Sequence, residues 1–168
     1  MTGVPEATAS GWAPALVAAG AAFLVALAGG LLTTTGPWYQ ALRRPAWKPP
    51  DWAFGPVWTT IFTLTAVSAV LAWNADAGFA ARAALLAAYA VNAGLNIAWS
   101  GLFFRLRRPD WALIEVVFLW LSIAALILVT ARVSGTAALL LLPYLAWVGV
   151  AAFLNRAIVR LNGPFRSA

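Results

Sequence analysis

Long apolar stretches separated by short polar or proline-rich segments dominate the chain. Five of them reach the roughly 20 residues that a helix needs to cross the hydrocarbon core of a bilayer. They cover residues 12–35, 54–73, 83–104, 111–131 and 136–159. Because lipid offers no hydrogen-bond partners to backbone groups, we expect helices rather than open strands. The pattern therefore predicts an all-α fold: an integral membrane bundle of five transmembrane helices.

The polar segments predict how these spans are connected. A short N-terminal extension (1–11) should precede one membrane domain (12–160), and a short tail (161–168) should follow it. The extension contains no Lys or Arg and the first apolar stretch exceeds 20 residues, so we expect a retained span rather than a cleaved signal peptide. The later links are short, which predicts that successive helices are antiparallel neighbours. These links are residues 74–82, 105–110 and 132–135.

Composition agrees with the membrane interpretation. The 168 residues are 63% hydrophobic and 10% charged, with a mean hydropathy of +0.85. Soluble domains carry about a quarter charged residues, so this chain has too little polar material for a water-facing surface. It has no Cys and no His, and Met1 is its only Met. We therefore expect no metal site, no Ser-His-Asp triad and no haem ligation through His, Cys or an internal Met.

The basic residues are unevenly divided between the two sides of the predicted bundle. Loops one and three share a side with the C-terminus, and the positive-inside rule places the basic side in the cytoplasm. The N-terminus should therefore lie outside. This division explains the net charge of +6 without nucleic acid, and the Ala- and Arg-rich composition points to a bacterial inner membrane. The basic side holds Arg43, Arg44, Lys48, Arg105, Arg107, Arg108, Arg156, Arg160 and Arg166, and the other side holds Arg82 and Arg132.

The segment between the first two spans has an unusual composition. Residues 36–58 hold five prolines and four tryptophans among 23 residues. Proline restricts its own backbone and that of the preceding residue, and indole rings offer large flat apolar faces. The segment is therefore suited to act as a stiff lid over the bundle. The alternative is an aromatic belt at the membrane interface, which is the better explanation for Trp38, Tyr39, Trp47 and Trp52 taken singly. The spacing of the prolines favours a shaped element for the segment as a whole.

Polar side chains recur along one face of the third span. Asn92, Asn96 and Ser100 follow one another at intervals of four residues, with Trp99 and Phe103 beside them. An amide in lipid is costly without a partner, so this face should point to the protein interior or to a ligand. Hydrogen bonding between helices, with no ligand, is the alternative.

Rows of small residues occur on two spans. Ala90, Gly94 and Ala98 lie opposite the polar face of the third span, and Ala18–Gly30 contains a similar row at intervals of four. Small residues allow close helix contact within a bundle or across a homodimer. The sequence does not decide which row forms a dimer face.

Two further residues interrupt the spans. Glu115 is the only acid inside a predicted span, and we expect it to pair with Arg105, Arg107 or Arg108 at the interface. Pro143 removes a backbone donor and is expected to kink the fifth span.

The chain carries several ordered motifs: Trp38–Tyr39, Arg44–Pro50, Phe54–Trp58, Asn92–Ser100 and Pro143–Trp147. Together they resemble the TspO family, also called the translocator protein family. The resemblance covers nearly all of the chain after the first dozen residues. It implies a five-helix bundle, often a homodimer, that binds tetrapyrroles such as protoporphyrin and haem, and other hydrophobic molecules, beneath the first loop.

The resemblance also implies particular ligand-binding residues and no required cofactor. Carried over by motif, they are Tyr39, Trp58, Phe62, Asn96, Trp99 and Trp147, with Trp47 in the lid and Ala151 at a small position of the fifth helix. Asn92 and Ser100 are added to this set because they lie four residues before and after Asn96 on the same helix face. The family includes proteins that degrade protoporphyrin in light and oxygen, which makes Trp58 and Trp147 candidate catalytic residues.

Two alternatives to a receptor or translocator therefore stay open: a porphyrin-degrading enzyme and a sensory or regulatory membrane protein. Arg156 stands where the animal proteins have a tyrosine in a proposed cholesterol motif, which lowers the expectation of sterol binding.

Overall fold

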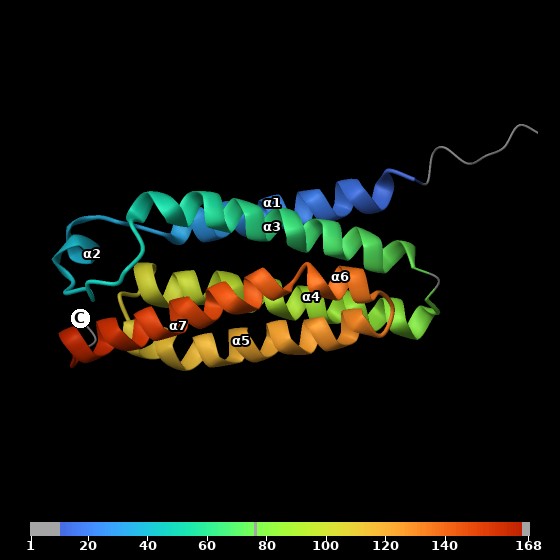
Figure 1. Ribbon diagram of the computed structural model, residues 1–168. Coiled ribbons are helices and arrows are strands. Elements are labelled where there is room, and N and C mark those ends of the chain that lie inside the picture. Colours follow the sequence, from blue (N-terminus) through green and yellow to red (C-terminus); the bar gives the residue numbers. More distant parts are fainter. Residues whose placement is uncertain (1–10, 76, 166–168) are drawn as a thin grey trace, which may run out of the picture.

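A computed structural model describes residues 11–75 and 77–165, and this part of the chain is helical without a strand. Of the predicted extension only Gly11 is described, whereas residues 161–165 of the predicted tail are described and the last helix ends at Asn162. Five long helices run along a common direction (Figure 1). They are α1 (Ala13–Leu32), α3 (Asp51–Asn74), α4 (Phe79–Ser100), α5 (Pro109–Ala131) and α7 (Leu142–Asn162), and the short elements are α2 (Pro37–Ala41), η1 (Gly101–Arg105) and α6 (Gly135–Leu139).

Five helical segments in the described part of the chain are long and apolar enough to cross a membrane. The wider π-helical turn η1 continues α4 as far as Arg105, and α6 leads into α7. The all-α bundle of five transmembrane helices is thereby confirmed. Four segments begin before the predicted span: α3 at Asp51 and α4 at Phe79 begin three and four residues early, and α5 at Pro109 and α6 at Gly135 begin two and one residues early.

The fifth span is broken where the sequence predicts a kink. α6 ends at Leu139, and α7 starts with Pro143 in its first turn. A proline ring collides with the carbonyl four residues earlier and has no N–H to donate, so a continuous α-helix cannot pass through this position undisturbed.

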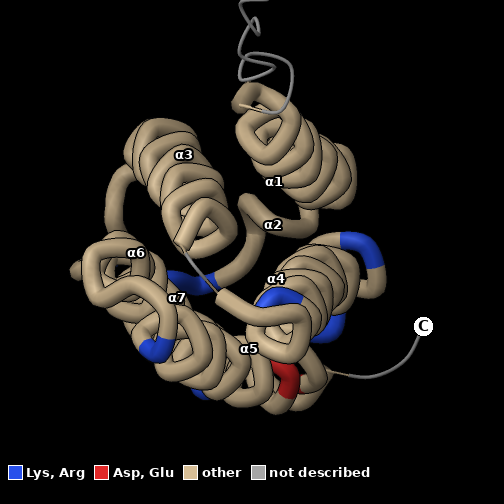
Figure 2. Tube along the Cα trace, turned by 90° about the vertical axis from the view of Figure 1, so that its right-hand side faces the viewer, with Lys and Arg blue, Asp and Glu red and all other residues tan. Residues whose placement is uncertain are grey.

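The helices form a ring, seen end-on in Figure 2, in the order α1, α3, α6/α7, α5, α4. The prediction that successive helices are neighbours is wrong for α3 and α4, because α1 lies between them. The chain from Asn74 to Phe79 can reach roughly 17 Å when extended. That distance exceeds the roughly 10 Å diameter of a helix, so a short link can step past a neighbour.

Packing is tight on one side of the ring and loose on the other. α5 lies between α4 and α7 and buries a stripe that includes Ala112, Val116, Leu119, Ile123 and Leu126. The intervals of three and four keep this stripe on one helix face. α1 has no fully buried residue. The three-helix layer α4/α5/α7 is therefore the tightly packed part of the ring, and we call it the packed frame. The α1/α3 pair packs less closely against it.

The proline-rich segment, the α4–α5 link and the end of α7 lie at the same end of the bundle (Figure 1). The basic residues predicted to share one side therefore do so in space, apart from Arg166, which lies outside the described residues.

Candidate functional site

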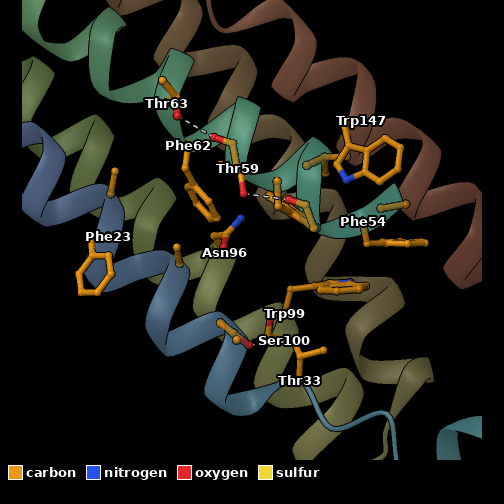
Figure 3. Close-up of a pocket in the computed structure, with 18 of the residues that line it drawn as sticks. Phe23, Thr33, Phe54, Thr59, Phe62, Thr63, Asn96, Trp99, Ser100 and Trp147 are labelled. Carbon is orange, nitrogen blue, oxygen red and sulfur yellow. Dashed lines mark hydrogen bonds between the residues drawn. The ribbon is translucent and has the colours of Figure 1, made fainter. Parts of the chain in front are cut away.

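A cavity of about 1080 Å³ lies inside the helix ring, between the α1/α3 pair and the packed frame. All five long helices contribute to its wall, and α2 contributes Tyr39 at the end with the proline-rich segment. Figure 3 shows aromatic rings from α3, α4 and α7 around this space, with Asn96 among them. The wall is mainly aromatic and aliphatic, and few polar groups interrupt it.

A buried hydrogen bond joins two sides of the cavity. The Asn96 side-chain Nδ2 donates to the Tyr144 hydroxyl at 2.9 Å, which ties α4 to α7. Trp58 packs its ring edge against Tyr144, with centroids 6.1 Å apart, and stacks on Phe62 at 5.4 Å. A polar link from α4 and an aromatic stack from α3 therefore meet at the same point.

Two indole N–H groups at the cavity are unused. Trp99 stacks on Phe103 at 5.2 Å, and Trp147 contacts Phe54 edge-on at 5.5 Å. Both indole Nε1 atoms are buried, and neither has a hydrogen-bond partner among the described residues. A buried donor without a partner costs about 1–3 kcal/mol.

Hydroxyl groups on the α3 wall are already satisfied. Thr59 donates to the carbonyl of Gly55 at 3.0 Å, and Thr63 donates to the carbonyl of Thr59 at 2.8 Å (Figure 3). Such bonds to the preceding turn occupy the hydroxyl proton. The α3 wall consequently presents methyl groups and lone pairs rather than free donors.

Charged side chains surround the mouth of the cavity. The Asp51 carboxylate forms ion pairs with Lys48 and with Arg44, the latter at 3.8 Å, and accepts a long hydrogen bond of 3.4 Å from Tyr39. The Arg44 guanidinium also lies 4.8 Å from the Tyr39 ring centroid. Burial raises the pKa of the Tyr39 phenol, and the Asp51 charge raises it further. These contacts give the proline-rich segment a defined shape at the mouth.

The structure brings most of the predicted site residues together. Asn92 instead lines a second cavity of about 510 Å³ between α1, α3 and α4, and donates to Ser122 of α5 at 3.0 Å. Ligand binding at all the predicted residues stays a prediction. The eight that line the main cavity are Tyr39, Trp58, Phe62, Asn96, Trp99, Ser100, Trp147 and Ala151.

Trp47 is not among the residues that line either of these cavities. Its side chain is 54% exposed and lies in a separate groove against the outer face of α7. The part of the segment that meets the main cavity is the neighbourhood of Tyr39 and Asp51.

The predicted ion pair of Glu115 does not form. Glu115 is only 9% exposed, and neither carboxylate oxygen has a hydrogen-bond partner in the described part of the chain. Arg108 pairs with Asp110 instead, its Nε donating at 2.8 Å. The prediction is wrong because Glu115 is buried with the apolar stripe of α5. The three arginines precede α5 and lie at the α4–α5 link.

The sequence interpretation missed a large part of the wall. Ala22, Ala26 and Gly30 of α1 line the main cavity, so their row faces inward. Phe54 and the Tyr144 partner of Asn96 were also not recognised as site residues. The regular row of small residues was the available signal for α1. Because Ala and Gly are small, this row marks α1 as a helix whose side chains cannot fill the interior.

Most of the cavity wall offers apolar contact rather than charge. The described residues contain no group of three or more His, Cys, Asp or Glu side chains that could hold a metal ion. A large apolar cavity with a few fixed polar groups is typical of a small-molecule site.

Comparison with known proteins gives the family. Residues 16–161 match the family described as the TspO/MBR family. The chain belongs to the TspO/MBR family. A "Tryptophan-rich protein TspO" from Chlorobaculum tepidum is 41% identical over 127 residues, which cover 74% of this chain and 79% of that protein.

Two further family members illustrate how widely the family is spread. The human "Translocator protein" is 37% identical over 130 residues, covering 77% of each chain. A "Tryptophan-rich sensory protein" from Cereibacter sphaeroides is 33% identical over 133 residues, covering 79% of this chain and 82% of that protein. The family's different names already include transport and sensing.

The Asn96–Tyr144 bond should be detectable as an energetic coupling. We expect Asn96→Ala and Tyr144→Phe to be non-additive, with a coupling free energy of about 0.5–1.5 kcal/mol. Unfolding of the four proteins of the cycle in detergent micelles would measure it. A cycle of Asn96→Ala with Ser68→Ala is the control, because Ser68 bonds to Tyr89 and Ala137 instead. Equal coupling in the two cycles would contradict the assignment.

Proposed function

We propose that this TspO/MBR protein is a membrane receptor or translocator that binds tetrapyrroles, such as protoporphyrin IX and haem, and related hydrophobic molecules in the main cavity. The observation that carries the proposal is the aromatic-lined space of about 1080 Å³ between the helices. Small-molecule pockets span about 300–1,000 Å³, so this one has room for a large, flat macrocycle.

The wall supplies complementary groups for such a ligand. Trp58, Phe62 and Trp147 offer ring faces for stacking on the macrocycle. The Asn96 side chain offers a fixed polar group at its edge. Arg44 and Lys48, which neutralise Asp51 at the mouth, would attract propionate groups. Binding would require no resident cofactor and no metal ligand from the protein.

The setting that we propose is a bacterial inner membrane. The end that carries the proline-rich segment and the C-terminus would face the cytoplasm, because it concentrates the basic residues. The N-terminus would face the other side. The lipid bilayer and the hydrophobic ligand are then the expected partners, and nucleic acid is not.

We also propose a homodimer formed through α4. Of the two rows of small residues, the α1 row lines the cavity, whereas Ala90, Gly94 and Ala98 of α4 are exposed on the outside. A Cβ added at Gly94 would meet nothing within 4 Å in the same chain. This face allows a close approach of two helices.

A second candidate function is light- and oxygen-dependent degradation of the bound porphyrin. The observation in its favour is that two indoles, Trp58 and Trp147, line one cavity beside other aromatic rings. Molecular oxygen would be the oxidant. A third candidate, a sensory or regulatory role, draws on the name of one relative, the "Tryptophan-rich sensory protein".

Protoporphyrin IX added in the dark should quench the protein's Trp fluorescence saturably. The triple variant Trp58→Ala, Asn96→Ala, Trp147→Ala should bind about tenfold more weakly or worse, because it loses two stacking faces and a fixed polar group. Trp52→Ala with Trp111→Ala is the control, since both indoles are exposed and neither lines the cavity. Unchanged affinity in the triple variant would reject this pocket.

Illumination separates the enzyme hypothesis from simple binding. If the indoles carry the chemistry, the unaltered protein should consume protoporphyrin in light and oxygen, and Trp58→Phe with Trp147→Phe should stop it while leaving stacking faces in place. Product analysis by absorbance and mass spectrometry measures this. Turnover that persists in the double variant would remove the basis of the hypothesis.

The dimer proposal predicts a specific effect of side-chain size. Gly94→Leu should shift the protein towards monomer in detergent, as seen by analytical ultracentrifugation, because the new side chain separates the two α4 helices. Gly20→Leu on α1 is the matched control: Gly20 is also exposed, with nothing within 4 Å of an added Cβ. An unchanged dimer fraction in Gly94→Leu would exclude this face.

A further inference from the structure

A groove of about 480 Å³ lies on the outside of the bundle, between the proline-rich segment and the outer face of α7. It is separate from both interior cavities. Trp47 forms one side, and Phe153, Arg156 and Arg160 of α7 form the other. Phe153 is 67% exposed, so the groove is continuous with a surface that faces lipid.

The groove is held in shape by the end of α7. The Asn162 side chain accepts a hydrogen bond from the Arg43 backbone N–H at 2.8 Å and donates to the Arg43 carbonyl at 2.8 Å. Its Nδ2 also donates to the carbonyl of Ile158 at 2.8 Å, which orients the amide. The prolines that follow limit the movement of the next residues. Trp47 is thereby fixed beside α7.

The groove carries two cations that nothing in the described chain neutralises. Arg156 and Arg160 lie one turn apart on the same helix face, and both are exposed. Neither forms an ion pair within residues 11–75 and 77–165. Of the acids in that part of the chain, Asp51 and Asp110 are paired with other cations and Glu115 is buried.

The position of Arg156 along α7 makes its charge energetically unfavourable without a partner. Arg156 lies six residues before the end of α7, which is roughly 9 Å along the axis. Exposed apolar side chains, Phe153 and Leu161, lie on either side of it along the groove. A guanidinium at the edge of the hydrocarbon needs a counter-charge or must extend towards the headgroups. Phospholipid headgroups are the anions available at that depth.

We propose that this groove binds an anionic phospholipid of the leaflet at the segment end of the bundle. Its phosphate would lie between the guanidinium groups of Arg156 and Arg160, which can bind phosphate through paired N–H donors. One acyl chain would run along Phe153, and Trp47 would cover the glycerol region, where indoles are favoured. The proposal does not depend on what the interior cavity binds.

Titration of phosphatidylglycerol into the full chain in non-ionic detergent, followed by native mass spectrometry, tests the site. We expect a saturable adduct with phosphatidylglycerol that phosphatidylcholine forms much more weakly. Arg156→Gln with Arg160→Gln should weaken it about 25-fold, because each basic residue near an anionic headgroup contributes about a factor of five.

Two comparisons separate a built site from general charge attraction. Arg105→Gln with Arg107→Gln makes the same charge change at the same end, away from the groove, and should leave the adduct nearly intact. Asn162→Leu leaves the net charge unchanged but releases the tether to Arg43, and should weaken binding.

Three results would overturn the proposal: equal binding of the two lipids, equal loss in both arginine pairs, or an unaffected adduct in Asn162→Leu. In each case the attraction would be nonspecific.

Discussion

The packing of α5 against α4 on one side and α7 on the other is the interaction on which the rest of the bundle depends. Its buried stripe, from Ala112 to Thr130, fills the space inside the three-helix layer. α1 offers Ala and Gly where it faces inward, so it cannot fill the space that remains. The cavity is therefore a consequence of composition: one half of the ring is packed with branched side chains, and the other half is lined by small residues and kept open by rings on α3 and α7.

Buried amides position the helices within this interior. Asn92 and Asn96 lie one turn apart on α4, and both are buried. Asn92 bonds to Ser122 across the α4–α5 contact, whereas Asn96 bonds to Tyr144 at the cavity wall. Lipid supplies no alternative partners, so such pairs fix which helix faces meet. The indole donors of Trp99 and Trp147 have no partner in the described part of the chain, and both belong to the main cavity.

The fold could be predicted from sequence because a membrane span has a length fixed by the bilayer and a composition fixed by lipid. The features that could not be predicted depend on contacts between residues that are far apart in the sequence. The Arg43–Asn162 pair, 119 residues apart in sequence, sets where Trp47 lies, and no local pattern reveals it. Glu115 was misplaced for a related reason, because its direction follows from the register of α5 against its neighbours. Motif spacing succeeded best within a helix, as with Asn96, Trp99 and Ser100.

The energetics of the proline-rich segment bear on how a ligand reaches the cavity. The two Asn162 bonds to Arg43 are exposed, and a hydrogen bond contributes only about 0.5–1.5 kcal/mol net. Tyr39 and Leu42, by contrast, are buried in a cluster with Phe103. Burying a large apolar side chain contributes about 1.5–3 kcal/mol, so the segment up to Leu42 is held mainly as part of the core, whereas the Asn162 bonds position the residues that follow.

The side of the cavity away from the proline-rich segment and the packed frame is formed by α1 and α3. Its wall includes Phe23 of α1 and Val67 of α3, and both side chains are exposed. These two helices lie outside the packed frame, and α1 has no fully buried residue, so the wall is held least firmly on this side. If the cavity binds a hydrophobic molecule as we propose, entry from the bilayer on this side would leave the proline-rich segment in place.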